Sequence, residues 1–210
     1  SGRVAGVEAL MRWRHADWGW VPPGEFIPVG EDCGLIDALG DWALETALTQ
    51  LADWRAQGLE LRMAVNLSAA QLRAPDLPDD IRHRLARHAV PPEALEIEIT
   101  ESVTMRDINQ ARTRLRAMTD TGVHLAIDDF GTGYSSLASM KHVRVDLLKI
   151  DMSFVAGLPE DAENAAITAA IIAMAEALGA EVVRLQGPGV AAAILQYARR
   201  RNVTRIVIGK

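Results

Sequence analysis

Polar side chains that can bind metal ions recur at the ends of apolar runs along the chain. They are Glu8, Asn66, Glu98, Glu101, Asp128 and Asp129. Oxygen donors of this kind suit Mg²⁺ or Mn²⁺ rather than a structural zinc ion. Adjacent carboxylates such as Asp128 and Asp129 can bridge two ions, and a two-metal site activates water for in-line attack on a phosphodiester. Lys149, inside the run Leu147–Ile150, adds a cation to this set.

An acid at the end of a strand has a simpler explanation, because it commonly caps the next helix or lies on the surface. That explanation is weaker for Asn66 and Glu98. Asn66 stands between Val65 and Leu67, and Glu98 interrupts the apolar run Leu95–Ile99. A buried polar group without a partner is costly. The pattern therefore favours a metal ion or a polar network at these positions.

Strand-like and helical runs alternate along the chain. The strand-like runs are Val7–Trp13, Met63–Leu67, Leu95–Ile99, His124–Ile127, Leu147–Ile150, Glu181–Leu185 and Arg205–Ile208. Helical periodicity covers Asp41–Ala56, Asn164–Leu178 and Val190–Arg201. This alternation predicts an α/β fold of parallel βαβ units, and seven runs are nearly enough for a (βα)8 barrel, whose strands would bring the polar residues to one mouth. A doubly wound open sheet is the alternative, weakened by the lack of a Gly-rich fingerprint after the first run.

Composition narrows the class of protein. The 210 residues are 49% hydrophobic and 24% charged, as in ordinary globular domains, and the net charge of −6 argues against binding to DNA or RNA. We find no secretory signal, and the apolar helical stretch Ala165–Ala175 is too short to span a membrane. The single cysteine, Cys33, fits a reducing compartment, so we expect a cytoplasmic location. We expect the five tryptophans to pack in the core or around a substrate, with exposure in a loop as the alternative for Trp18 and Trp20.

Several ordered motifs resemble the EAL family of cyclic di-GMP phosphodiesterases. The motifs are Glu8–Leu10, Phe26–Glu31, Asn66–Ser68, Glu98–Glu101, Asp128–Leu137 and Lys149–Asp151. The resemblance extends from Val4 to Val183. It implies a TIM-like (βα)8 barrel that hydrolyses cyclic di-GMP to its linear form, pGpG. It also implies two divalent ions, Mg²⁺ or Mn²⁺, with as few as one retained in this chain.

The resemblance implies a metal-binding role for five residues. Glu8, Asn66, Glu98 and Asp128 would bind one ion, and Asp128 would also bridge to a second ion with Asp129 beside it.

Four further residues receive roles from the same resemblance. Lys149 would orient or stabilise the attacking water, Arg12 would bind a phosphate of the dinucleotide, and Leu10 would line the same wall. Glu101 would anchor the loop Asp129–Leu137. The implied partners are cyclic di-GMP itself, a second copy in a homodimer, and sensor domains fused upstream.

The chain departs from the family pattern after Val183. The pattern there reads Ala-Glu-Gly-Val-Glu, and its first glutamate serves as general base and as a ligand of the second metal. This chain reads Arg184-Leu-Gln-Gly-Pro188, so Leu185 and Pro188 take the two glutamate positions. Since leucine can neither accept a proton nor bind Mg²⁺, we expect the phosphodiesterase to be weakened or inactive. A non-catalytic cyclic di-GMP binding module is the alternative, and a scaffold without native function is a further one.

The last part of the chain carries a resemblance of its own. Gly179–Val183, Val190–Arg200 and Asn202–Lys210 are similar to the universal-stress-like region of potassium-responsive sensor histidine kinases. Residues 181–210 hold six basic residues and one acid, a net charge of +5, against −11 for residues 1–180. We therefore expect a chimera, with residues 1–180 as an EAL-like barrel portion and residues 181–210 as an exchanged strand-helix-strand unit. This unit would complete or flank the barrel, and ATP binding by it is a weaker alternative.

Overall fold

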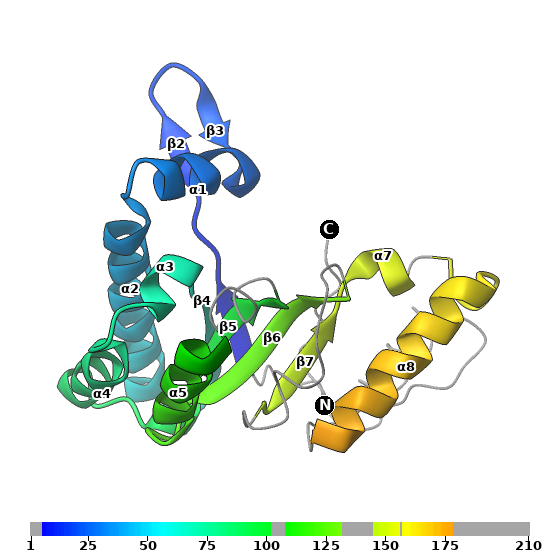
Figure 1. Ribbon diagram of the computed structural model, residues 1–210. Coiled ribbons are helices and arrows are strands. Elements are labelled where there is room, and N and C mark those ends of the chain that lie inside the picture. Colours follow the sequence, from blue (N-terminus) through cyan, green and yellow to red (C-terminus); the bar gives the residue numbers. More distant parts are fainter. Residues whose placement is uncertain (1–5, 102–107, 132–144, 156, 179–210) are drawn as a thin grey trace.

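A curved parallel sheet forms the centre of the computed structural model, which describes residues 6–101, 108–131, 145–155 and 157–178 (Figure 1). Its strands are Gly6–Ala9 (β1), Arg62–Asn66 (β4), Leu95–Thr100 (β5), His124–Phe130 (β6) and Leu147–Ile150 (β7). They lie in the order β1-β4-β5-β6-β7, and each neighbouring pair is parallel. Because this order follows the chain, the sheet is a half-barrel of the (βα)8 type, and the predicted α/β class is confirmed.

Helices cover the outer face of the half-barrel. Helix α2 (Ile36–Ala56) packs on β4, α5 (Ile108–Thr119) on β6 and α8 (Ala162–Leu178) on β7. Helix α4 (Leu77–Arg87) lies beside α2 and α5. The shorter helices are α1 (Pro23–Asp32), α3 (Ala69–Leu72), the 3-10 turn η1 (Pro92–Ala94) and α7 (Met152–Val155).

The two faces of each strand differ in chemistry because successive side chains point to opposite sides. On β5, Leu95, Ile97 and Ile99 belong to the hydrophobic core, whereas Glu96 and Glu98 lie on the other face, toward the inside of the half-barrel. The same alternation on β1, β4, β6 and β7 places Glu8, Asn66, Asp128 and Lys149 on the inner face. Five neighbouring strands thus present their polar residues to one interior.

The first strand-like run is shorter than predicted. We expected one strand over Val7–Trp13, but β1 ends at Ala9 and Trp13 begins a separate strand, Trp13–His15 (β2). Strand β2 pairs antiparallel with Gly19–Val21 (β3), so it forms a hairpin of its own, which projects above α1 (Figure 1). The periodicity of the run does not reveal the break, because the apolar residues Leu10 and Met11 continue the run beyond Ala9.

The prediction of core packing is wrong for Trp13 and Trp42, whereas the alternative of exposure holds for Trp18 and Trp20. Trp18, Trp20 and Trp42 are 73%, 69% and 58% exposed, and Trp13 is also exposed. Trp54 alone is partly buried against the core. The exposed side chains lie on the hairpin and near the beginning of α2, where no layer of the described residues covers them.

Two predicted helices are confirmed: Asp41–Ala56 falls within α2, which begins earlier at Ile36, and Asn164–Leu178 falls within α8. The predicted runs Glu181–Leu185, Val190–Arg201 and Arg205–Ile208 lie outside the described residues. Over the described ranges, no helix is both long and apolar enough to cross a membrane.

Candidate metal centre

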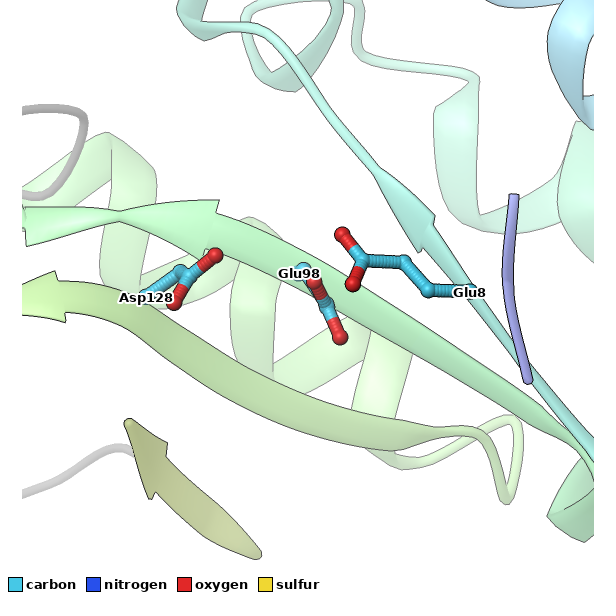
Figure 2. Close-up of side chains that lie close together, drawn as sticks. All are labelled: Glu8, Glu98 and Asp128. Atoms are coloured by element: carbon cyan, nitrogen blue, oxygen red, sulfur yellow. The ribbon is translucent and has the colours of Figure 1, made fainter. Parts of the chain in front are cut away.

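Three carboxylates from three different strands meet on the inner face of the half-barrel. Oxygens of Glu8 on β1, Glu98 on β5 and Asp128 on β6 all lie within 4.8 Å of one another (Figure 2). Glu98 is fully buried, and the other two side chains are half-buried. Three converging carboxylate oxygens are a donor set that hard divalent cations prefer. We call Glu8, Glu98 and Asp128 the carboxylate cluster.

Strand register brings the cluster together. Glu8 lies opposite Ala64, and Glu98 lies between Asn66 on one side and Ala126 on the other. Small residues on β4 and β6 therefore leave room beside the longer glutamate side chains. Asp128 lies opposite Thr100, one inner-face position beyond Glu98.

Asn66, at the end of β4, joins the cluster through Glu8. Its Nδ2 donates a hydrogen bond of 3.0 Å to Glu8 Oε1. The chain just after Asn66 is held firmly, because the Leu67 N–H donates to the Glu98 carbonyl at 2.8 Å and Ser68 with Gln71 forms a capping box at the start of α3. The sequence prediction overlooked this capping box, although Ser-x-x-Gln is its signature.

Lys149, on β7, supplies positive charge from the other side. Its ammonium contacts Glu98 Oε1 and lies 3.8 Å from Asp128 Oδ2. Its side chain is only 11% exposed. The one lysine predicted for the site thus lies against two of the three cluster carboxylates.

Burial and neighbouring charges perturb the acids of the site. Burial raises the pKa of Glu98 to about 7, because the contact with Lys149 offsets only part of the desolvation, and Glu8 and Asp128 add repulsion. The pKa of Asp129 is also raised, chiefly by burial and then by the charges of Asp128 and Asp151. A bound cation would reverse this balance by favouring the ionised carboxylates.

Asp129 and Gly131 give the chain a sharp turn at the end of β6. Asp129 has φ of +53°, a left-handed conformation that is uncommon for a residue with a side chain, and its N–H donates to Asp128 Oδ1 at 3.0 Å. Gly131 has φ of +105°, and an added Cβ would lie 2.7 Å from Phe154. The Gly131 N–H donates to the buried Glu101 carboxylate at 2.8 Å. Glu101 therefore holds the beginning of the predicted loop, whose residues 132–137 lie outside the described ones.

A family model described as the EAL domain matches residues 1–185. The chain belongs to the EAL domain family. It is 42% identical over 184 residues to the bifunctional diguanylate cyclase/cyclic di-GMP phosphodiesterase MucR of Pseudomonas aeruginosa, covering 87% of this chain and 27% of MucR. It is 43% identical over 184 residues to the cyclic di-GMP phosphodiesterase NbdA of the same organism, covering 87% of this chain and 24% of NbdA. The chain thus spans about a quarter of the length of these relatives.

Solved structures of EAL domains share the fold. The MucR phosphodiesterase in complex with cyclic di-GMP superposes with a TM-score of 0.81 at 39% identity, over 96% of this chain and 81% of that one. The EAL domain of FimX from Pseudomonas aeruginosa, bound to cyclic di-GMP, superposes with a TM-score of 0.76 at 27% identity, over 90% of this chain and 76% of that one. The predicted EAL membership is confirmed by the family match.

The EAL motif itself spans the end of β1 and the link that follows. Glu8 enters the carboxylate cluster, while Leu10 lies beyond the strand and is 53% exposed. Arg12 is also exposed in this link, and its Nη1 donates to the Met11 carbonyl at 2.8 Å. The structure therefore brings Glu8, Glu98 and Asp128 together and holds Asn66 against Glu8, whereas Leu10 and Arg12 lie in the link beyond β1.

Proposed function

We propose that the chain binds cyclic di-GMP together with a divalent cation, Mg²⁺ or Mn²⁺, at the carboxylate cluster, and that it hydrolyses the dinucleotide slowly or not at all. The convergence of Glu8, Glu98 and Asp128 from three strands carries this proposal. The family match and two relatives named for cyclic di-GMP phosphodiesterase activity support the choice of ligand.

The donor chemistry fits a hard cation. Glu8, Glu98 and Asp128 offer carboxylate oxygens, Asn66 lies against Glu8, and Asp129 directly follows Asp128 in the chain. When bound, such an ion polarises a phosphoryl oxygen and lowers the pKa of bound water. The first four of these residues would hold one ion, and Asp128 with Asp129 would hold a second.

Other residues would serve the dinucleotide. Arg12 would pair with a phosphate, because a guanidinium forms two parallel hydrogen bonds to such a group. Leu10, exposed beside it, would contact the ligand's apolar surface. Lys149 would orient a water for attack, and Glu101 would keep the turn at Gly131 in place through its hydrogen bond.

Slow hydrolysis follows from residues 184–188. Leu185 and Pro188 take the positions of two glutamates in the family pattern. In that pattern the first glutamate is the general base. Loss of a general base typically lowers the rate by 10²- to 10⁴-fold, and loss of a metal ligand adds to that. This observation favours a second candidate function, that of a cyclic di-GMP binding module without turnover.

We also propose that residues 1–180 are the EAL-like barrel portion and that residues 181–210 are an exchanged strand-helix-strand unit. The change in sequence pattern and in net charge supports this division, and the family match ends nearby at residue 185. Fusion to upstream sensor domains and pairing of two copies belong to the same proposal, and the larger size of the curated relatives supports the fusion.

The test is a calorimetric titration of cyclic di-GMP into the full chain with Mg²⁺, followed by chromatography of the same sample for pGpG. Binding that disappears in EDTA and in the Glu8→Gln variant supports the proposal. A turnover rate comparable with that of an intact EAL phosphodiesterase would contradict the proposal that hydrolysis is slow or absent. Absence of binding would contradict the proposed function as a whole.

A further inference from the structure

Lys149 and a bound divalent cation would both interact with the carboxylate oxygens of Glu98 and Asp128. The lysine ammonium contacts Glu98 and lies 3.8 Å from Asp128 Oδ2, and both residues belong to the carboxylate cluster. The ammonium therefore borders the space into which the three carboxylates converge. Its own side chain has little freedom to move away into solvent, because it is only 11% exposed.

The packing of β7 explains why the lysine points inward. Leu148 and Ile150, its neighbours along the strand, pack against the hydrophobic core on the outer face. Alternation then directs Lys149 to the inner face. Strand β6 lies between β7 and β5, so the lysine reaches past β6 to Glu98.

Charge makes this contact significant. Three carboxylates within 4.8 Å of one another repel, and Glu98 is fully withdrawn from water. A nearby cation therefore relieves this repulsion, and Lys149 brings a positive charge against two of the three carboxylates.

We infer that Lys149 is a tethered counter-cation of the carboxylate cluster: it stabilises the cluster when no metal is bound, and it lowers the cluster's affinity for a divalent metal by repulsion. Lys149 is thus a positioning residue for the three carboxylates. This role is separate from the proposed contact of Lys149 with the attacking water. This inference rests on the proposed metal site. It means that metal affinity is set by a balance between the single charge of the lysine and the double charge of the ion.

A second ion pair that involves a glutamate of β5 provides a matched control. Glu96, two residues before Glu98, is 3% exposed, and its Oε2 lies 3.4 Å from Arg62 Nη1. This pair also joins a buried glutamate of β5 to a basic residue of another strand, but neither member belongs to the carboxylate cluster. Substitution of Arg62 therefore removes a similar ion pair without touching the metal ligands.

The test measures Mn²⁺ affinity by calorimetry and thermal stability in EDTA for the full chain and for Lys149→Met, Lys149→Arg and Arg62→Met. We expect Lys149→Met to bind Mn²⁺ at least about fivefold more tightly, the lower end of typical coupling between sites. We also expect it to melt earlier in EDTA and to gain more from added Mn²⁺. Lys149→Arg keeps the charge and should bind Mn²⁺ like the parent chain. Arg62→Met should lose stability with unchanged affinity.

The outcomes separate the inference from the proposed function. Equal or weaker Mn²⁺ binding by Lys149→Met, with a parent chain that binds, overturns the inference alone. Binding by Lys149→Met but not by the parent chain supports the inference. Failure of both to bind Mn²⁺ overturns the metal site and the inference with it. Should Lys149→Met not fold in EDTA, the double variant Lys149→Met/Glu98→Gln should recover folding, because it removes the uncompensated buried charge; no recovery would count against the inference.

Discussion

Glu98 and Lys149 form an ion pair on the inside of the half-barrel, with β6 between their strands. Glu98 is fully buried and Lys149 nearly so. Removing one member of a buried pair leaves an uncompensated charge, which typically costs about 3–5 kcal/mol. The pair is thus a strong structural constraint at the place where Glu8 and Asp128 also converge, and it ties the stability of the sheet to the electrostatics of the candidate metal centre.

Replacement of a cluster carboxylate should weaken metal binding. Glu8→Gln keeps the size of the side chain but removes the charge, so we expect Mn²⁺ affinity to fall by about tenfold or more, as even outer partners of metal ligands have effects of that size. Calorimetry with the full chain measures this directly. Glu25→Gln, a substitution on α1 at an exposed acid, is the control and should bind like the parent. Equal loss in both variants would contradict a specific role for Glu8.

Gly131→Ala should destabilise the turn after β6. Its φ of +105° is unfavourable for alanine, and the new Cβ would lie 2.7 Å from Phe154. We expect a loss of about 1–3 kcal/mol in the free energy of unfolding, measured with urea. Gly58→Ala separates the two causes, since Gly58 has φ of +82° with no atom within 4 Å of an added Cβ. A loss at Gly131 no larger than that at Gly58 would show that the contact with Phe154 is unimportant.

Glu45 should contribute stability that disappears in acid. Its carboxylate lies 2.8 Å from His88 Nε2 and also pairs with Arg84 and Arg87. The hydrogen bond with His88 is the largest cause that lowers the pKa of Glu45 below its ordinary value of 4.5. A lowered folded-state pKa adds stability above about pH 4.5, and this stability is lost as pH falls through the lowered value.

The stability contributed by Glu45 can be tested by comparing the unfolding of the parent chain and of Glu45→Gln at several pH values. Because Glu45 is 38% exposed, we expect the variant to lose less than about 1 kcal/mol near pH 7. The difference in urea-unfolding free energy should shrink steadily below about pH 4.5. Glu60→Gln, a substitution of an exposed acid, is the control. A difference that stays constant down to pH 3 would contradict the role of the Glu45 carboxylate.

The proposed loss of the general base can be tested at Leu185. If Leu185 occupies the family's glutamate position, Leu185→Glu should increase cyclic di-GMP hydrolysis by at least about tenfold, a fraction of the 10²- to 10⁴-fold that a general base supplies. Chromatographic detection of pGpG measures the effect, and Leu185→Gln is the uncharged control. Equal rates for the parent and both variants would show that the position is misassigned or that further residues are needed.

The inner-face cluster could be predicted from the sequence because of two simple periodicities. Parallel strands in chain order bring their carboxyl ends together, and alternation separates Glu98 from its neighbours Ile97 and Ile99. The sequence therefore predicted that Glu8, Glu98 and Asp128 would converge, and the structure brings them together. Membership of the EAL family was equally visible in the ordered motifs.

Other features depend on tertiary packing that periodicity does not encode. The contact between Lys149 and Glu98 depends on the curvature of the sheet across β6. The break after Ala9 arises because Trp13–His15 pairs with its own hairpin partner rather than with β4. Trp18 and Trp20 are exposed for the same reason, since the hairpin extends beyond the helices that cover the sheet.

The most direct test of the proposed site is one titration of cyclic di-GMP into the full chain, with Mg²⁺ and again with EDTA, followed by chromatography for pGpG. We predict binding that requires Mg²⁺, with little or no linear product. Binding that is equally tight in EDTA, or no binding in either condition, would contradict a metal-dependent cyclic di-GMP site at Glu8, Glu98 and Asp128.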